Sequence, residues 1–291
     1  MSFGVAKILL YAKVVRAQVL FMPGLLSLCA YLYAHRKYGA AWNAAFILVV
    51  ASALLFNLAV NAISEYRDCR KGIDDMCSPG TRYRLASGIV PQRNVLSLGI
   101  VFFVAASLCG FAALIVGNPV LLIPGVAAAS IAFFYSERPF ELKYHALGEV
   151  CVFVVYAPLL FSSYILALTD GIFGVRDLLF SVPFGLLTTN VVLANNIRDY
   201  EFEKEKNNTL AIKYGLKFAY GLLFTTTHLA FLLLPLFVYV GILPLLSLAA
   251  FLAYPLIFVA ASKTNSPKFV NVFGIMQVAF TLLICISLTG R

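Results

Sequence analysis

Nine apolar runs of about 17 or more residues dominate this chain. A helix of that length can cross a hydrocarbon core of roughly 30 Å while satisfying its own backbone hydrogen bonds. Only 12% of the 291 residues are charged and 62% are hydrophobic, whereas soluble domains carry roughly 25% charged residues. The sequence therefore predicts an all-α integral membrane protein. The runs cover residues 17–34, 41–60, 95–116, 119–135, 146–168, 178–194, 218–240, 242–261 and 269–289.

The segment Gly117-Asn118-Pro119 decides the number of spans. It predicts a turn between two helices, because proline has no N–H to donate and disfavours helix in the residue before it. The alternative is one kinked helix and eight spans. With nine spans, all 22 Lys and Arg residues except Arg36, Lys37, Arg176 and Arg291 fall on one side. The positive-inside rule predicts that this side and the N-terminus face the cytoplasm, and we expect the membrane to be the cell membrane.

The formal net charge of +9 does not require a nucleic acid partner. Basic loops on the cytoplasmic side meet anionic membrane lipids and an anionic substrate, which account for the excess. No composition shift separates a soluble domain from the spans. We therefore expect a single transmembrane domain over residues 1–291.

Two acidic clusters follow apolar runs on the predicted cytoplasmic side. The first is Ser64-Glu65-Tyr66-Arg67-Asp68 continuing to Asp74, and the second is Asn195-Asn196-Ile197-Arg198-Asp199 continuing to Glu203. All 13 carboxylates except Asp170 and Asp177 lie on this side. Carboxylates at a membrane boundary are costly unless they have a use. Their oxygens suit Mg²⁺, which also binds phosphate oxygens, so the clusters indicate a diphosphate substrate.

The spacing of the acidic residues favours a shared site. Asp199 and Glu203 are four residues apart, which places both on one face of a helix. Gly72 lies between Asp68 and Asp74, so we expect the helix to end before Asp74 and the chain to bend back. The alternative interpretation is a set of solvated loop charges that pair with neighbouring basic side chains.

Basic, amide and phenol side chains near the clusters are the second part of the candidate site. The candidates for diphosphate oxygens are Arg82, Arg84, Lys143 and Arg198, each of which is alternatively a topology determinant. The amides are Asn61, Asn190, Asn195 and Asn196, which either join helices by hydrogen bonds or contact a ligand. The phenols are Tyr135, Tyr156 and Tyr164, which either line a cavity or belong to an interfacial belt.

Four segments of the chain resemble motifs of the UbiA superfamily of intramembrane prenyltransferases, in the form seen in its menaquinone branch. They are residues 61–74 (NAISEYRDCRKGID), 82–88 (RYRLASG), 135–149 (YSERPFELKYHALGE), and 195–203 (NNIRDYEFE) followed by Thr209-Leu210-Ala211. The chain departs from the family pattern at four places, one of which is the absence of the family's proline from the segment 82–88. Ser64 stands where an asparagine is usual, Glu203 replaces an aspartate, and Asn207-Asn208 replaces a Gly-Lys pair.

This resemblance implies nine helices around a central cavity whose active site lies at the cytoplasmic end. It implies an isoprenyl diphosphate donor, Mg²⁺, and an aromatic or lipid acceptor. The residues it assigns to catalysis and metal binding are Asp68, Asp74, Asp199 and Glu203. Those it assigns to substrate binding are Asn61, Ser64, Arg82, Arg84, Tyr135, Lys143, Asn195, Asn196 and Arg198.

The form of the motifs favours 1,4-dihydroxy-2-naphthoate as the acceptor, in lipoquinone biosynthesis. Two alternatives within the family are transfer to a glycerol-phosphate lipid and transfer to 4-hydroxybenzoate. An alternative of another class is a cation-coupled secondary transporter. Transporter cation sites usually lie near the bilayer midplane, whereas these carboxylates lie at the predicted membrane boundary, which argues against transport.

Overall fold

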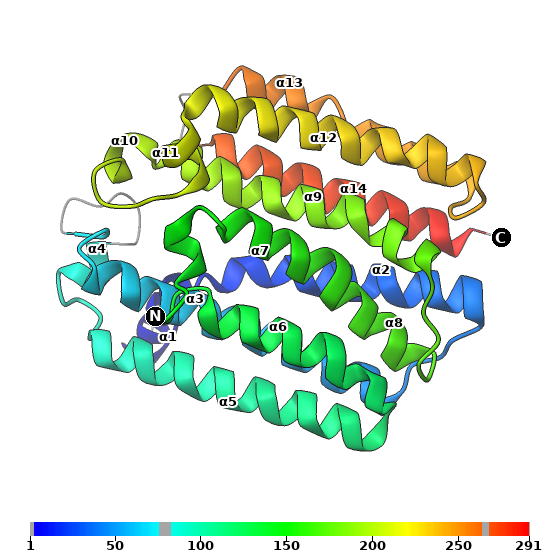
Figure 1. The fold of residues 1–291 in the computed structure, drawn as a ribbon, viewed down its shortest axis with the longest axis horizontal. Coiled ribbons are helices and arrows are strands. Elements are labelled where there is room, and N and C mark those ends of the chain that lie inside the picture. The colour runs from blue at the N-terminus through cyan, green and yellow to red at the C-terminus, as the bar shows by residue number, and fades with distance from the viewer. Residues whose placement is uncertain (1–2, 76–82, 264–267, 291) are drawn as a thin grey trace.

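The computed structural model describes residues 3–75, 83–263 and 268–290, and every regular element in these ranges is a helix (Figure 1). The long α-helices are α2 (Phe21–Tyr38), α3 (Ala44–Arg70), α5 (Gln92–Val116), α9 (Val175–Arg198), α12 (Leu216–Tyr239) and α14 (Phe269–Thr289). The shorter α-helices are α1 (Phe3–Val14), α4 (Tyr83–Ala86), α6 (Leu122–Phe134), α7 (Gly148–Val154), α8 (Ser162–Leu168), α10 (Tyr200–Glu203), α11 (Leu210–Tyr214) and α13 (Leu256–Ala261). Four segments are 3₁₀-helices, η1 (Ala17–Leu20), η2 (Pro119–Leu121), η3 (Leu142–His145) and η5 (Leu245–Ala253), and η4 (Val155–Phe161) is a π-helix.

Within these ranges, seven helical segments are long and apolar enough to cross a membrane. They cover residues 17–38, 44–70, 92–116, 148–168, 175–198, 216–239 and 269–289. The runs expected at 119–135 and 242–261 form shorter apolar helices, Pro119–Phe134 and Leu245–Ala261. The prediction of an all-α membrane protein is confirmed, whereas the count of nine spans stays a prediction.

The segment after α5 forms a turn between two helices, as its proline predicts. The Asn118 side chain accepts a hydrogen bond from the Val120 N–H (2.9 Å) and so caps the start of η2. A Cβ on Gly117 would lie 2.7 Å from the Cβ of Ala45 on α3, so only glycine permits this close approach. Helices α5 and α6 are therefore antiparallel neighbours (Figure 1).

Burial differs strongly between the helices of the bundle. In α9, 67% of the most apolar window is buried, because this helix packs against α12, α14, α7 and η4. In α5 the share is only 17%, and its main partner is α3. Five apolar residues of α5 are each more than half exposed at a spacing of three or four residues: Val101, Val104, Leu108, Phe111 and Ile115. Such a stripe suits contact with lipid tails.

The two ends of the bundle carry different residues. The ends of α3 and α9 lie together with α4, α10 and α11, at the left of Figure 1. We call this the acidic end, because Asp68, Asp74, Asp199 and Glu203 lie there. The opposite end holds the turns that join α2 to α3 and α5 to α6.

Candidate active site

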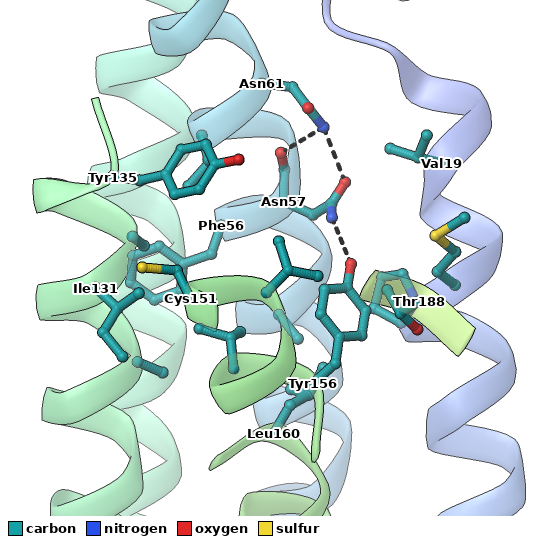
Figure 2. Close-up of a pocket in the computed structure, with 18 of the residues that line it drawn as sticks. Val19, Phe56, Asn57, Asn61, Ile131, Tyr135, Cys151, Tyr156, Leu160 and Thr188 are labelled. Atoms are coloured by element: carbon teal, nitrogen blue, oxygen red, sulfur yellow. Dashed lines mark hydrogen bonds between the residues drawn. The ribbon is translucent and has the colours of Figure 1, made fainter. Parts of the chain in front are cut away.

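A cavity of about 290 Å³ runs through the bundle from the acidic end. Its walls come from η1, α2, α3, α5, η2, α6, η3, α7, η4, α8, α9 and α10 (Figure 2 shows the deeper part). Carboxylates and cations lie at the acidic end, and mostly apolar side chains line the remainder. The cavity therefore suits a ligand with one strongly charged end and an apolar body.

Asp68 lies at the mouth of this cavity, 4% exposed. One of its oxygens forms an ion pair with the Lys143 ammonium, and the other accepts a hydrogen bond from the Tyr144 hydroxyl (2.8 Å). Lys143 also donates to the Ser64 hydroxyl (2.8 Å), one turn earlier on α3. Four residues of the proposed motifs therefore meet in one hydrogen-bonded group.

The loop that carries Lys143 is fixed to the end of α3 by ion pairs. Arg67 pairs with Glu137, and Lys71 pairs with Glu141 at 2.9 Å. These contacts bring residues about 70 positions apart together. Side chains on two elements are thus held in place before a substrate arrives, which lowers the ordering cost of binding.

The end of α3 follows the geometry that Gly72 predicts. The helix ends at Arg70, and Gly72 has φ 71°, a left-handed conformation that glycine adopts without strain. The N–H groups of Ile73 and Asp74 then both donate to the Asp68 carbonyl, at 3.0 and 3.2 Å. The expectation that the helix ends before Asp74 and the chain bends back is confirmed.

The second acidic cluster lies where α9 gives way to α10. Asp199 has φ −89° and ψ 0°, so α9 ends at Arg198 and a further helical turn begins at Tyr200. The N–H of Glu203 donates to the Asp199 carbonyl (2.9 Å), which keeps these two residues on one face. Both line the cavity and both are 7% exposed. Arg198 points its guanidinium back to the Asp199 carboxylate, with N–O distances of 2.8 and 2.7 Å.

The structure brings most of the predicted site residues to one cavity. Those that line it are Asn61, Ser64, Asp68, Tyr135, Lys143, Asn195, Asn196, Asp199 and Glu203. Asp74, Arg84 and Arg198 do not line it, although Asp74 is buried near its mouth and Arg198 binds Asp199. Arg82 lies outside the described residues. What each residue does to a substrate stays a prediction.

Sequence reasoning missed Arg16, which also lines the cavity mouth and forms an ion pair with Glu65. Arg16 has φ 52° and separates α1 from η1, so the chain turns there and the guanidinium faces the cavity. The charge of Glu65, ahead of those of Asp68 and Asp74, raises the pKa of Arg16 further above its usual value. No motif marked this residue, because its role depends on a bend that the sequence did not indicate.

A line of polar residues on α3 was also only partly recognised. Asn57 and Tyr156 form a hydrogen-bonded chain with Asn61 inside the cavity (Figure 2). Asn57, Asn61, Ser64 and Asp68 recur every three or four residues, which is one face of a helix. That spacing is the sequence signal that could have identified Asn57 as a residue of the site. Nothing local indicates that Tyr156 completes the chain.

The protonation of Tyr144 suits its contact with Asp68. Burial, followed by the charge of Asp68, raises the pKa of Tyr144 well above its usual value. Tyr144 therefore stays protonated at physiological pH and donates to the carboxylate. The Asp68 oxygens are held in one orientation as a result.

The residues at the acidic end fit Mg²⁺ by their donor chemistry. Asp68, Asp199 and Glu203 place carboxylate oxygens on one cavity, with buried side chains and cations beside them. Among the residues that the structure describes, no three Asp, Glu, His or Cys side chains form a compact metal-binding group. Mg²⁺ is usually bound by one or two carboxylates together with substrate phosphates, so such a compact group is not needed.

Comparison with known proteins gives a consistent family. The model of the UbiA prenyltransferase family matches residues 20–286. The 1,4-dihydroxy-2-naphthoate octaprenyltransferases of Mycobacterium leprae and Bacillus subtilis are 30% and 29% identical to this chain over 60% and 64% of its length. The matched parts are 58% and 60% of those proteins' own length. UbiA prenyltransferase domain-containing protein 1 of Danio rerio is 32% identical over 72% of this chain and 63% of that protein.

Solved structures show the same fold over nearly the whole chain. A UbiA homolog from Archaeoglobus fulgidus bound to DMAPP and Mg²⁺ has a TM-score of 0.67 and 16% identity, and covers 97% of this chain and 99% of that one. A UbiA homolog from Aeropyrum pernix K1 has a TM-score of 0.67 and 18% identity, over 93% and 96% of the two chains. From the family match and this shared fold, the chain belongs to the UbiA prenyltransferase family.

Proposed function

We propose that this protein transfers a prenyl group from an isoprenyl diphosphate to an aromatic acceptor, and that the acceptor is 1,4-dihydroxy-2-naphthoate, in lipoquinone biosynthesis. The observation that carries the proposal is the cavity itself, whose charged mouth continues into an apolar interior. Two relatives at about 30% identity, those of Mycobacterium leprae and Bacillus subtilis, are naphthoate octaprenyltransferases by name, which supports this acceptor. We also infer that all nine apolar segments of a single domain span the membrane, with the N-terminus and the acidic end in the cytoplasm.

The residues at the mouth would hold the diphosphate of the donor. Asp68, Asp199 and Glu203 are the proposed Mg²⁺ ligands, with Asp74 as the fourth carboxylate of the set. Bound there, Mg²⁺ supplies positive charge that stabilises the departing diphosphate. Lys143 and Arg16 lie on the same mouth and provide charged donors for phosphate oxygens. Arg82, Arg84 and Arg198 are further candidates from the adjoining loops.

The interior would then direct the bond-forming step. When the allylic C–O bond breaks, its electron pair leaves with the diphosphate, and a ring carbon of the acceptor supplies the pair for the new C–C bond. The same ring carbon then loses the group it carried, either a proton that the departing diphosphate takes up or a carboxylate that leaves as CO₂, and the ring regains its aromaticity. Apolar helices keep water away from the allylic cation, which water would otherwise capture. Phe56 and Tyr135 line the cavity, and aromatic rings at these positions would stabilise a positive charge next to them.

The proposal is tested by product analysis with purified protein in detergent or nanodiscs. Geranylgeranyl diphosphate and Mg²⁺ are incubated with 1,4-dihydroxy-2-naphthoate, 4-hydroxybenzoate or a glycerol-phosphate lipid, and products are identified by mass. We expect prenylated naphthoate, its loss in EDTA, and recovery when Mg²⁺ is restored. Product from another acceptor alone would overturn the naphthoate assignment. Cation-coupled uptake into liposomes without any product would overturn prenyl transfer.

A further inference from the structure

The cavity has two unlike walls below its charged mouth. Helices α5 and α6 contribute only Gly, Ala and Ile side chains, namely Gly110, Ala113, Gly125, Ala128, Ile131 and Ala132. The facing wall, from α3, η4 and α9, contributes amide and hydroxyl groups between apolar side chains such as Phe56 and Leu160 (Figure 2). An isoprenoid chain needs only apolar contact. The amide and hydroxyl groups of the facing wall are therefore available to a second, polar ligand.

Three polar side chains of that wall form a one-way chain of hydrogen bonds. Asn61 donates to the side-chain oxygen of Asn57 (3.1 Å) and to its carbonyl (2.9 Å), and Asn57 donates to the Tyr156 hydroxyl (2.8 Å). Because each residue donates to the next, the last proton in the chain belongs to Tyr156. Chains of this kind polarise their members, which strengthens the terminal donor.

The proton of Tyr156 differs from the protons of three other hydroxyls on the cavity wall, those of Ser52, Ser163 and Thr188. Ser52 donates to the Ala106 carbonyl, and Ser163 and Thr188 donate to backbone carbonyls four residues earlier, each at 2.8 Å. Within the described parts of the chain, Tyr156 only accepts, from Asn57, and makes no such donation. Tyr156 is 9% exposed, and a buried donor without an acceptor costs free energy unless a ligand supplies one.

The backbone conformation around Tyr156 supports a functional role for this residue. Tyr156 lies in the π-helix η4, which contains Pro158, a residue without an N–H for a regular helix. π-helical segments are uncommon and occur frequently at functional sites. The widened turn holds the Tyr156 ring toward the cavity and opposite Asn57 on α3 (Figure 2).

The depth of Tyr156 fits an acceptor placed behind the diphosphate. Its partner Asn57 precedes Asp68 by eleven residues on α3, a rise of about 16 Å. The space between the levels of Asp68 and Asn57 would hold two groups: the diphosphate of the donor at the mouth, and the acceptor ring within about 3–3.5 Å of the donor's reacting carbon. A ring hydroxyl of the acceptor then reaches the level of Tyr156.

We propose that Tyr156, held by Asn57 and Asn61, donates a hydrogen bond to a ring hydroxyl of the aromatic acceptor and so selects and orients it. This inference rests on the proposed function and names a recognition element within it. Tyr156 is a specificity-determining residue, and Asn57 is a positioning residue that acts through it. The apolar wall of α5 and α6 is left for the isoprenoid chain.

The test compares Tyr156→Phe with wild type, using Tyr164→Phe as the matched control. Tyr164 is also buried, but it does not line the cavity and donates to the Pro23 carbonyl (3.2 Å). We expect Tyr156→Phe to raise the acceptor KM by about tenfold and leave the KM of the diphosphate unchanged. Tyr164→Phe should change neither constant. An unchanged acceptor KM in Tyr156→Phe would overturn the inference.

Acceptor analogues that lack one hydroxyl identify the bonded group. In wild type, removal of the hydroxyl that meets Tyr156 should weaken binding by about tenfold, and in Tyr156→Phe the same removal should cost nothing further. Asn57→Ala alone should weaken acceptor binding, whereas adding Asn57→Ala to Tyr156→Phe should weaken it no further. Additive losses would show that the side chain and the hydroxyl do not meet, which contradicts the inference.

Equilibrium binding separates this inference from the proposed function. Binding of 1,4-dihydroxy-2-naphthoate is followed by its fluorescence without any diphosphate, for wild type and Tyr156→Phe. If wild type forms product and both proteins bind the acceptor equally, the inference about Tyr156 is contradicted, whereas the proposed function is not. No product with any aromatic acceptor, and no naphthoate binding to wild type, would overturn both.

Discussion

Two buried aspartates at opposite ends of the bundle have nearly the same partners. At the acidic end, Asp68 is held by the consecutive pair Lys143-Tyr144. At the opposite end, Asp177 is held by the consecutive pair Lys37-Tyr38, at 2.6 and 2.7 Å. Each group joins segments that are far apart in sequence, by 75 residues in one case and 140 in the other. Local chemistry alone does not distinguish them.

Their surroundings do distinguish them. Asp177 also accepts the Gly174 N–H (2.7 Å) and so caps α9, is fully buried, and lies away from the cavity. Asp68 faces the cavity, and its cationic partner Lys143 lines the same mouth. We infer that one group ties helices together and the other meets a ligand. Variants at matched positions should therefore affect stability at one end and turnover at the other.

The largest effect is expected for Asp68→Asn. Loss of one proposed Mg²⁺ ligand removes charge stabilisation worth several kcal/mol, so kcat/KM should fall about 1000-fold. Prenyl transfer is measured with saturating Mg²⁺, and the melting temperature is recorded in parallel. The assignment of Asp68 to the site would be contradicted if the Asp68→Asn variant unfolds, or if it keeps more than a tenth of wild-type turnover.

Asp177→Asn should give the converse result. Removing a buried charge that pairs with Lys37 should destabilise the fold by about 3 kcal/mol and lower the melting temperature on the order of 10 °C. Turnover per folded molecule should stay at the wild-type level, because Asp177 does not line the cavity. Loss of turnover in fully folded Asp177→Asn would show that the comparison between the two ends is wrong.

The two lysines offer a smaller version of the same contrast. Lys143→Met should raise the diphosphate KM by about tenfold, since a charged donor to phosphate oxygens is lost. Lys37→Met should leave that KM unchanged and lower only the melting temperature. Both side chains keep their apolar stems, so packing changes little. Equal KM values in the two variants would remove Lys143 from the diphosphate site.

The sequence indicated the helical framework well, because apolar length and turn residues are local signals. The Gly117-Asn118-Pro119 turn and the end of α3 before Gly72 lie where their backbone chemistry requires. The run at 242–261 was less predictable. It divides into the 3₁₀-helix η5 and α13 around Pro255, so its length as a single α-helix was overestimated.

The site was only partly predictable, because its remaining members depend on contacts distant in sequence. Asp68 and Asp199 carried motif signals, whereas Arg16 reaches the cavity only through the bend between α1 and η1. Tyr156 meets Asn57 across 99 residues. Asp177 looked like an outer loop charge, since nothing near it in sequence indicates the Lys37-Tyr38 pair.

The smallest effect concerns the ion pair between Lys71 and Glu141, which ties the Lys143 loop to α3. The hydrogen bond from Lys71 lowers the pKa of Glu141 below its usual 4.5. A carboxyl with a lowered folded-state pKa adds stability above its unfolded-state pKa and loses it as pH falls through the folded-state value. At pH 7 Glu141→Gln should lower the melting temperature by only about 1–2 °C, because the pair is partly exposed. That difference from wild type should shrink as the pH falls below 4.5 and vanish below the lowered folded-state pKa of Glu141. The control Glu201→Gln, in a surface pair with Lys204 that joins no separate elements, should show no such convergence. A difference that persists in acid would mean that Glu141 contributes by packing instead of charge.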